Sequence, residues 1–117
     1  MKTVLIIDDS AFMRRLIRNI VTKNGYNVIG EAVNGKIGVD KYKELRPDVV
    51  TMDLVMDEMT GLEALKEILE ANPEANVFMV SSMGQEVIVR DAIMMGAKDF
   101  IHKPFDEHQV MEAFKKL

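Results

Sequence analysis

Residues 49–61 read VVTMDLVMDEMTG, and an apolar run at the start of this stretch ends in the carboxylate of Asp53. The preceding residues are apolar or β-branched, which is typical of a buried strand. An ionised side chain is costly to bury without a partner, so other groups must meet Asp53. Two further acids, Asp57 and Glu58, follow before Gly61.

Similar runs elsewhere in the chain predict a set of short strands. Residues 3–7, 47–52, 76–80 and 99–102 are the clearest, and the weaker, alternating run 26–32 fits an edge strand. Helical spacing of apolar residues between the runs predicts helices at 11–23, 35–45, 61–71, 85–95 and 107–116. Three helix starts have cap candidates: Ser10, the capping-box pair Thr60 and Glu63, and Asp106.

The order of these elements predicts an α/β fold. Strand and helix alternate along all 117 residues with short loops and no linker, so we expect one domain spanning residues 1–117. This alternation is the pattern of a parallel sheet covered by helices on both faces. Ligands of such sheets bind outside the carboxyl ends of the strands.

Composition excludes several classes of function. With 15 Lys and Arg against 19 Asp and Glu, the net charge is −4, which disfavours binding to nucleic acid or to an anionic membrane. The chain has no cysteine, so disulfides and thiol catalysis are excluded. It shows no signal-peptide core, and no apolar run approaches the ~20 residues of a spanning helix. We therefore expect a cytoplasmic protein.

Polar residues follow most of the predicted strands at the edge where ligands bind. They are Asp8 and Asp9, Asp53, Ser81, and Lys103. Each alone has an ordinary explanation as a turn former, a helix cap, a loop hydroxyl or a solvated charge. Together they place three carboxylates beside an ammonium and a hydroxyl, which suits a hard ion such as Mg²⁺ and a phosphoryl group.

Four motifs resemble the signatures of the response-regulator receiver domain, and single-domain chemotaxis receivers are the most similar. The motifs are IIDDS (6–10), VTMDLVM (50–56), VSSMG (80–84) and DFIHKPF (99–105). The resemblance covers essentially the whole chain. It implies a doubly wound, flavodoxin-like, five-stranded parallel sheet in the order 2-1-3-4-5.

The resemblance also implies a role for each matching residue. Asp53 would accept a phosphoryl group from a sensor histidine kinase of the chemotaxis type or from a small phosphodonor. The ligands of Mg²⁺ or Mn²⁺ would be Asp8, Asp9, Asp53 and the backbone carbonyl of Val55. The phosphoryl group would contact Ser81 and Lys103, Phe100 would be the aromatic switch, and the Lys103–Pro104 bond would be cis. The protein would catalyse only its own phosphorylation and dephosphorylation.

Two further sets of residues carry expectations about rate and partners. Val55 and Met83 occupy the positions that tune hydrolysis in this family, and neither side chain can orient a water, so we expect slow autodephosphorylation. The expected docking surface joins Val89 and Ile93 to Phe100 and His102, although two apolar stripes on helix 85–95 also fit a wide core face. The partner there would be a flagellar switch protein or a phosphatase, and we expect a monomer.

Three alternatives remain at this point. The first is a receiver from a longer regulator with an output domain, although nothing basic or linker-like follows Leu117, which favours a free-standing module. A Mg²⁺-dependent phosphohydrolase with an aspartyl nucleophile would need an acid where Val55 stands, and a nucleotide-binding protein would need glycines where DDSAF stands (8–12). Asp57 replaces the proline usual in receivers, so it is either a solvated loop acid or a fourth carboxylate near the ion.

Overall fold

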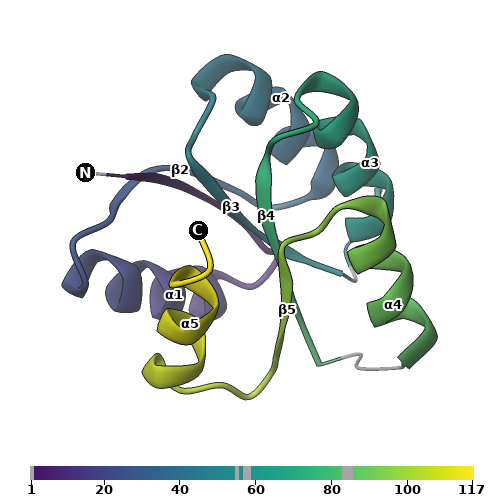
Figure 1. The fold of residues 1–117 in the computed structure, drawn as a ribbon. Coiled ribbons are helices and arrows are strands. Elements are labelled where there is room, and N and C mark those ends of the chain that lie inside the picture. The colour runs from purple at the N-terminus through teal and green to yellow at the C-terminus, as the bar shows by residue number, and fades with distance from the viewer. Residues whose placement is uncertain (1, 55, 57–58, 83–85) are drawn as a thin grey trace.

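The computed structural model describes residues 2–54, 56, 59–82 and 86–117, in which strands and helices alternate along the chain (Figure 1). The strands are β1 Thr3–Ile7, β2 Asn27–Ala32, β3 Val49–Asp53, β4 Asn76–Ser81 and β5 Asp99–His102. The helices are α1 Ala11–Lys23, α2 Gly35–Leu45, α3 Gly61–Ala71, α4 Glu86–Met95 and α5 Glu107–Phe114. Among these residues no helix is both long and apolar enough to cross a membrane.

The strands form one five-stranded sheet in the order β2-β1-β3-β4-β5, and every pair is parallel. The predicted α/β class, parallel sheet and strand order are therefore confirmed. Helices α1 and α5 cover one face, and α2, α3 and α4 cover the other (Figure 1). Strand β3 is buried throughout, whereas β2 is half-buried along most of its length, as predicted for an edge strand.

Two apolar clusters hold the sheet between these helices. Because side chains alternate along a strand, Val4 and Ile6 of β1 join the cluster under α1 and α5, and Leu5 and Ile7 join the other. In the α1/α5 cluster, the ring of Phe78 stacks on that of Phe114 with centroids 5.0 Å apart. Packing on both faces fixes where the carboxyl ends of the strands lie.

Some predicted boundaries differ from the structure. Strand β3 was expected at 47–52 but begins at Val49, and it includes Asp53, which is in register with Val80 of β4. Proline at 47 has no N–H for a ladder. Helix α5 ends at Phe114 rather than at residue 116. Helix α4 begins at Glu86, and residue 85 lies outside the described residues.

The apolar pattern of α1 also needs one correction. Ile17, Ile20 and Val21 are buried, but Phe12, which shares the spacing of Leu16 and Ile20, is 72% exposed. Phe12 lies in the first turn, at the end of the helix next to the sheet edge rather than over the middle of the sheet. Helical spacing of apolar residues does not distinguish a residue at the end of the helix from one over the middle of the sheet.

Gly61 fixes the start of α3 against the end of β3. A Cβ at this position would overlap the carbonyl oxygen of Asp53 and lie 2.7 Å from the Cα of Leu54. The amide of Gly61 donates to the carbonyl of Leu54 at 2.8 Å, and the predicted capping box of Thr60 and Glu63 is present. Only a residue without a side chain permits this approach.

Candidate functional site

The carboxyl ends of β1, β3, β4 and β5 bring the predicted polar residues to one edge of the sheet. Asp8, Asp53 and Ser81 are buried, with exposures of 1%, 5% and 2%, whereas Asp9 is exposed. One carboxylate oxygen from each of Asp8, Asp9 and Asp53 lies within 4.8 Å of the other two. Residues separated by up to 45 positions in the chain thus form one acidic cluster.

Lys103 supplies a positive charge to this cluster. Its Nζ lies 3.0 Å from Oδ2 of Asp8 and 3.6 Å from Oδ1 of Asp53. Its backbone N–H donates to the carbonyl of Ser81 at 3.0 Å, which joins the end of β4 to the turn after β5. The Lys103–Pro104 peptide bond is cis, as predicted.

Asp8 is held at both its backbone and its side chain. Its N–H donates to the carbonyl of Ala32 at 3.0 Å, and the amide of Ser10 donates to its Oδ1 at 2.9 Å. Its own carbonyl accepts a hydrogen bond from Nη1 of Arg14 at 2.7 Å. The start of the acidic loop is therefore anchored from β2, from α1 and from Lys103.

The electrostatics of the cluster favour a bound cation. Burial raises the pKa of Asp53, the charge of Asp8 raises it further, and Lys103 only partly offsets these effects. Among the described residues, the ammonium of Lys103 thus pairs with two carboxylates of a cluster of three. The cluster offers oxygen donors without sulfur or imidazole, which are the ligands that Mg²⁺ and Mn²⁺ prefer, so these residues fit such an ion.

Sequence reasoning missed a second charged group, formed by Glu31, Arg14 and Arg18, which contacts Asp8 through Arg14. Glu31 of β2 accepts from Nε of Arg14 at 3.0 Å and from Nε of Arg18 at 2.7 Å. Burial alone would raise the pKa of Glu31, but the hydrogen bonds from Arg18 and Arg14 hold it below its ordinary value. One signal was available: Arg14 lies in the first turn of α1, where the helix dipole disfavours a cation.

Several predicted site residues cannot be placed. Val55, Asp57 and Met83 lie outside the described residues, so the carbonyl ligand, the fourth carboxylate and the hydrolysis positions stay predictions.

The predicted docking residues lie on α4 and β5. Ile93 is 42% exposed and His102 is exposed, whereas Val89 and Phe100 are half-buried. Ile88 and Ala92 of the other stripe pack on the core as expected, but Met95 is 38% exposed. Sequence spacing did not single out Val87 and Met94, which are 57% and 78% exposed.

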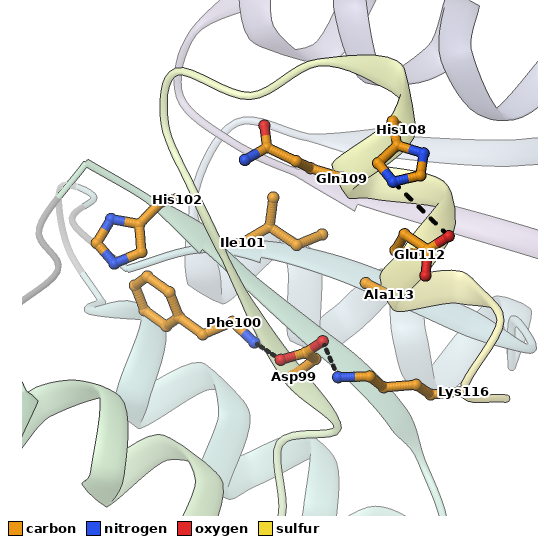
Figure 2. A pocket seen from close by; sticks show the side chains of 9 residues that line it. All are labelled: Asp99, Phe100, Ile101, His102, His108, Gln109, Glu112, Ala113 and Lys116. Carbon is orange, nitrogen blue, oxygen red and sulfur yellow. Dashed lines mark hydrogen bonds and ion pairs between the residues drawn. The ribbon is translucent and has the colours of Figure 1, made fainter.

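Phe100 and His102 also line a hollow between β5 and α5 of about 400 Å³ (Figure 2). Their rings meet edge to face, with centroids 5.2 Å apart and an angle of 60° between the ring planes. Across the hollow, α5 presents His108, Gln109 and Glu112, and Lys116 pairs with Asp99 at 2.8 Å. This side of the molecule therefore combines an aromatic pair with charged groups.

Known proteins resemble the chain in both sequence and structure. It is 54% identical to the chemotaxis protein CheY of Thermotoga maritima over 99% of this chain and 97% of that protein. It is also 54% identical to CheY of Bacillus subtilis over 97% of this chain and 94% of that protein. The CheX-CheY-BeF3-Mg²⁺ complex of Borrelia burgdorferi contains a similar structure, with a TM-score of 0.95, 39% identity, and coverage of 97% of this chain and 86% of that one.

The resemblance extends to part of a longer protein. A protein-glutamate methylesterase/protein-glutamine glutaminase of Archaeoglobus fulgidus is 45% identical over 86% of this chain but only 29% of its own length. The family described as response regulator receiver domain matches residues 4–115. The chain therefore belongs to the response regulator receiver family and is similar to CheY over nearly its whole length.

Proposed function

We propose that this receiver is a chemotaxis response regulator of the CheY kind, which accepts a phosphoryl group on Asp53 from a histidine kinase. One observation carries the proposal: the ammonium of Lys103 lies between the buried carboxylates of Asp8 and Asp53, within 3.0 and 3.6 Å. A site built only for stability would gain little from burying two carboxylates beside one cation, because the cost of desolvation can exceed the attraction.

Asp53 is the nucleophile in this proposal. Its carboxylate oxygen attacks the phosphorus, the bond from phosphorus to the histidine nitrogen of the donor breaks, and the electron pair leaves with that nitrogen. Lys103 balances the charge that spreads over the transferring oxygens, which is much of what phosphoryl transfer requires. Acetyl phosphate, as a small donor, would react in the same way.

The acidic cluster would hold the ion that this reaction needs. Asp8, Asp9 and Asp53 would be side-chain ligands, and the carbonyl of Val55 remains a predicted fourth. A bound Mg²⁺ or Mn²⁺ supplies positive charge that offsets the repulsion between these carboxylates and the phosphoryl oxygens. Burial of Asp8 and Asp53 strengthens that interaction because little water competes.

Ser81 and Phe100 form the proposed switch. The Ser81 hydroxyl, at the end of β4, would donate to the phosphoryl group after transfer. Because the carbonyl of Ser81 already accepts from the amide of Lys103, both residues that contact the phosphoryl group are linked by the main chain. Movement there would reach β5 and change the packing of Phe100 beside His102.

The expected partners follow from this reading. The donor would be a chemotaxis-type kinase, and the surface with Val89, Ile93, Phe100 and His102 would bind a flagellar switch protein or a phosphatase. The complex of CheX with CheY from Borrelia burgdorferi supports a protein partner for a receiver of this kind. A monomeric, cytoplasmic protein of one domain, acting on no substrate but itself, is part of the same proposal.

The proposal also covers the rate of hydrolysis. With Val55 and Met83 at the two tuning positions, autodephosphorylation would be slow. Combining Val55→Asn with Met83→Glu should hasten the decay of phosphorylated Asp53. Decay no faster in that double variant would contradict the water-orienting explanation.

Mass spectrometry tests the central claim. Incubation with acetyl phosphate and Mg²⁺ should add one phosphoryl group, and omission of the divalent ion should prevent it. Asp53→Asn should remove the adduct. Asp48→Asn is the matched control, because Asp48 immediately precedes the same strand but lies at its other end.

Two results would contradict the proposal. One is the absence of any Mg²⁺-dependent adduct on the intact protein. The other is an adduct that persists in Asp53→Asn at the level seen in Asp48→Asn, which would place the phosphoryl group elsewhere.

A further inference from the structure

We propose that Arg14 is a positioning residue of the acidic site: its guanidinium, anchored by Glu31, holds the backbone carbonyl of Asp8 and so keeps Asp8 and Asp9 arranged to receive a divalent ion. This inference rests on the proposed function and assigns it a residue that touches neither the ion nor the phosphoryl group. Arg14 acts through the main chain of Asp8.

The first support is the geometry of Arg14. Its Nη1 donates to the carbonyl of Asp8 at 2.7 Å while its Nε donates to Oε1 of Glu31 at 3.0 Å. The guanidinium thus spans from β2 to the residue that ends β1. Its side chain is only 15% exposed, so water competes little for either bond.

The second support is the anchoring of Glu31 itself. Arg18 places Nη2 2.6 Å from Oε2 of Glu31, and Nζ of Lys41 donates to the backbone carbonyl of Glu31 at 2.5 Å. Side chains from α1 and α2 therefore hold this residue of an edge strand. A fixed Glu31 gives Arg14 a fixed direction.

The third support is the position of Arg14 in its helix. The first turn of α1 contains no acidic residue, and a cation there is disfavoured by the helix dipole. Local helix stability thus does not explain Arg14. Its bonds to Asp8 and Glu31 do.

Removal of Arg14 should change the affinity for a divalent ion in opposite directions, depending on whether Arg14 acts through its charge or by positioning Asp8. The direction of the change therefore decides between the two explanations. Loss of a positive charge near a cation site should strengthen ion binding if charge alone acts. Loss of a group that holds a ligand-bearing loop should weaken it. Partners of metal ligands typically contribute about 10-fold or more to affinity.

The test uses Mn²⁺ alone as the probe, with free ion counted by electron paramagnetic resonance in a titration of the full chain. Arg14→Met should bind Mn²⁺ about 10-fold more weakly than the original protein. Arg15→Met is the matched control. Arg14 and Arg15 both line a surface hollow of about 310 Å³ beside Glu31. Among the described residues, Arg14 donates hydrogen bonds to Asp8 and Glu31 and Arg15 does not. Its affinity should be unchanged or higher.

A second variant covers the case in which Arg14→Met fails to fold. Arg14→Lys keeps the charge, but one ammonium cannot reproduce the two-ended bridge of a guanidinium. It should bind Mn²⁺ about 3-fold more weakly, an intermediate loss. Unfolding by urea without divalent ion separates loss of stability from loss of affinity in each variant.

The outcomes distinguish this inference from the proposed function. Affinity of Arg14→Met equal to or above that of Arg15→Met would overturn the inference, as would an affinity of Arg14→Lys equal to that of the original protein. If the original protein binds no Mn²⁺ and accepts no phosphoryl group, the proposed function fails and this inference fails with it.

Discussion

Two aspartates mark the two ends of β3, and their surroundings differ in kind. Asp48, just before the strand, is exposed and accepts hydrogen bonds from the amide and hydroxyl of Thr3 at 2.8 and 3.1 Å. The backbone hydrogen bond from Thr3 is the main cause that lowers the pKa of Asp48. Burial, followed by the charge of Asp8, raises the pKa of Asp53.

The comparison separates an acid that the fold satisfies, Asp48, from the acid proposed to react, Asp53. At the amino end of the strands, donors that belong to the fold satisfy the carboxylate. At the carboxyl end, two acids are buried together with one cation, and the fold alone does not complete the site. Under the proposed function, a bound ion would complete the balance of charge at this end of the strands.

Among the described residues, Lys103 is the cation that pairs with both buried acids, and its removal should have the largest effect. Lys103→Met leaves Asp8 and Asp53 buried without their partner, so we expect the free energy of unfolding in EDTA to fall by about 3 kcal/mol. Urea denaturation measures it. The control is Lys98→Met, because Lys98 precedes β5 at the opposite edge and is exposed. Equal losses in both variants would contradict the difference between the edges.

Neutralising each aspartate should change stability in opposite directions. In EDTA, Asp53→Asn should raise the free energy of unfolding by about 1 kcal/mol, because it removes repulsion from Asp8. Asp48→Asn should lower it by about 0.5 kcal/mol, because the bonds from Thr3 lose their charge. Changes of the same sign would refute the comparison.

The pH dependence sharpens this contrast. Asp53 has a pKa above its ordinary value of 3.8, so its contribution favours folding at low pH and is lost as pH rises through 3.8 towards the raised value. Asp48 has a pKa below 3.8, so its contribution is present above 3.8 and is lost as pH falls through the lowered value. For each Asn variant, its free energy of unfolding is subtracted from that of the original protein at each pH. The two difference curves should slope in opposite directions. Parallel difference curves would be incompatible with these assignments.

A further comparison concerns Thr51, which lies between the two ends of β3. Thr51 is 1% exposed, and its hydroxyl has no hydrogen-bond partner among the described residues. Thr51→Val should therefore stabilise the protein by about 1 kcal/mol in urea denaturation. Thr3→Val is the control and should destabilise, since the Thr3 hydroxyl bonds to Asp48. A loss of stability in Thr51→Val would show that the hydroxyl has a partner.

The fold was largely predictable because the sheet is covered on both faces. That arrangement makes β1, β3 and β4 nearly continuous apolar runs, and the caps at Ser10, Thr60 and Asp106 are local signals that the structure retains. Boundaries were less predictable at two places. Pro47 has no N–H to donate to a strand ladder. After Phe114, the amide of Lys116 donates to the carbonyl of Ala113, three residues back, rather than continuing the α-helical pattern.

The meeting of the site residues was predictable because parallel strands end at one edge. Asp8, Asp9, Asp53 and Lys103 are each adjacent to the end of a strand, so strand order alone brings them together. Arg14 and Glu31 were missed because their contact depends on side-chain direction across α1 and β2. The exposure of Phe12 was missed because helical spacing indicates which face of a helix a residue is on. It does not indicate whether that part of the helix lies over the sheet.

The close approach at Gly61 has a consequence for how this sequence tolerates change. Its missing side chain leaves room for the carbonyl of Asp53 itself, so any other residue there displaces the backbone of the proposed phosphoacceptor. In a saturation library selected for chemotaxis, position 61 should therefore accept glycine alone. Such a library would show position 61 to be as intolerant of substitution as Asp8, Asp9 and Asp53, although glycine has no side chain that could take part in the chemistry.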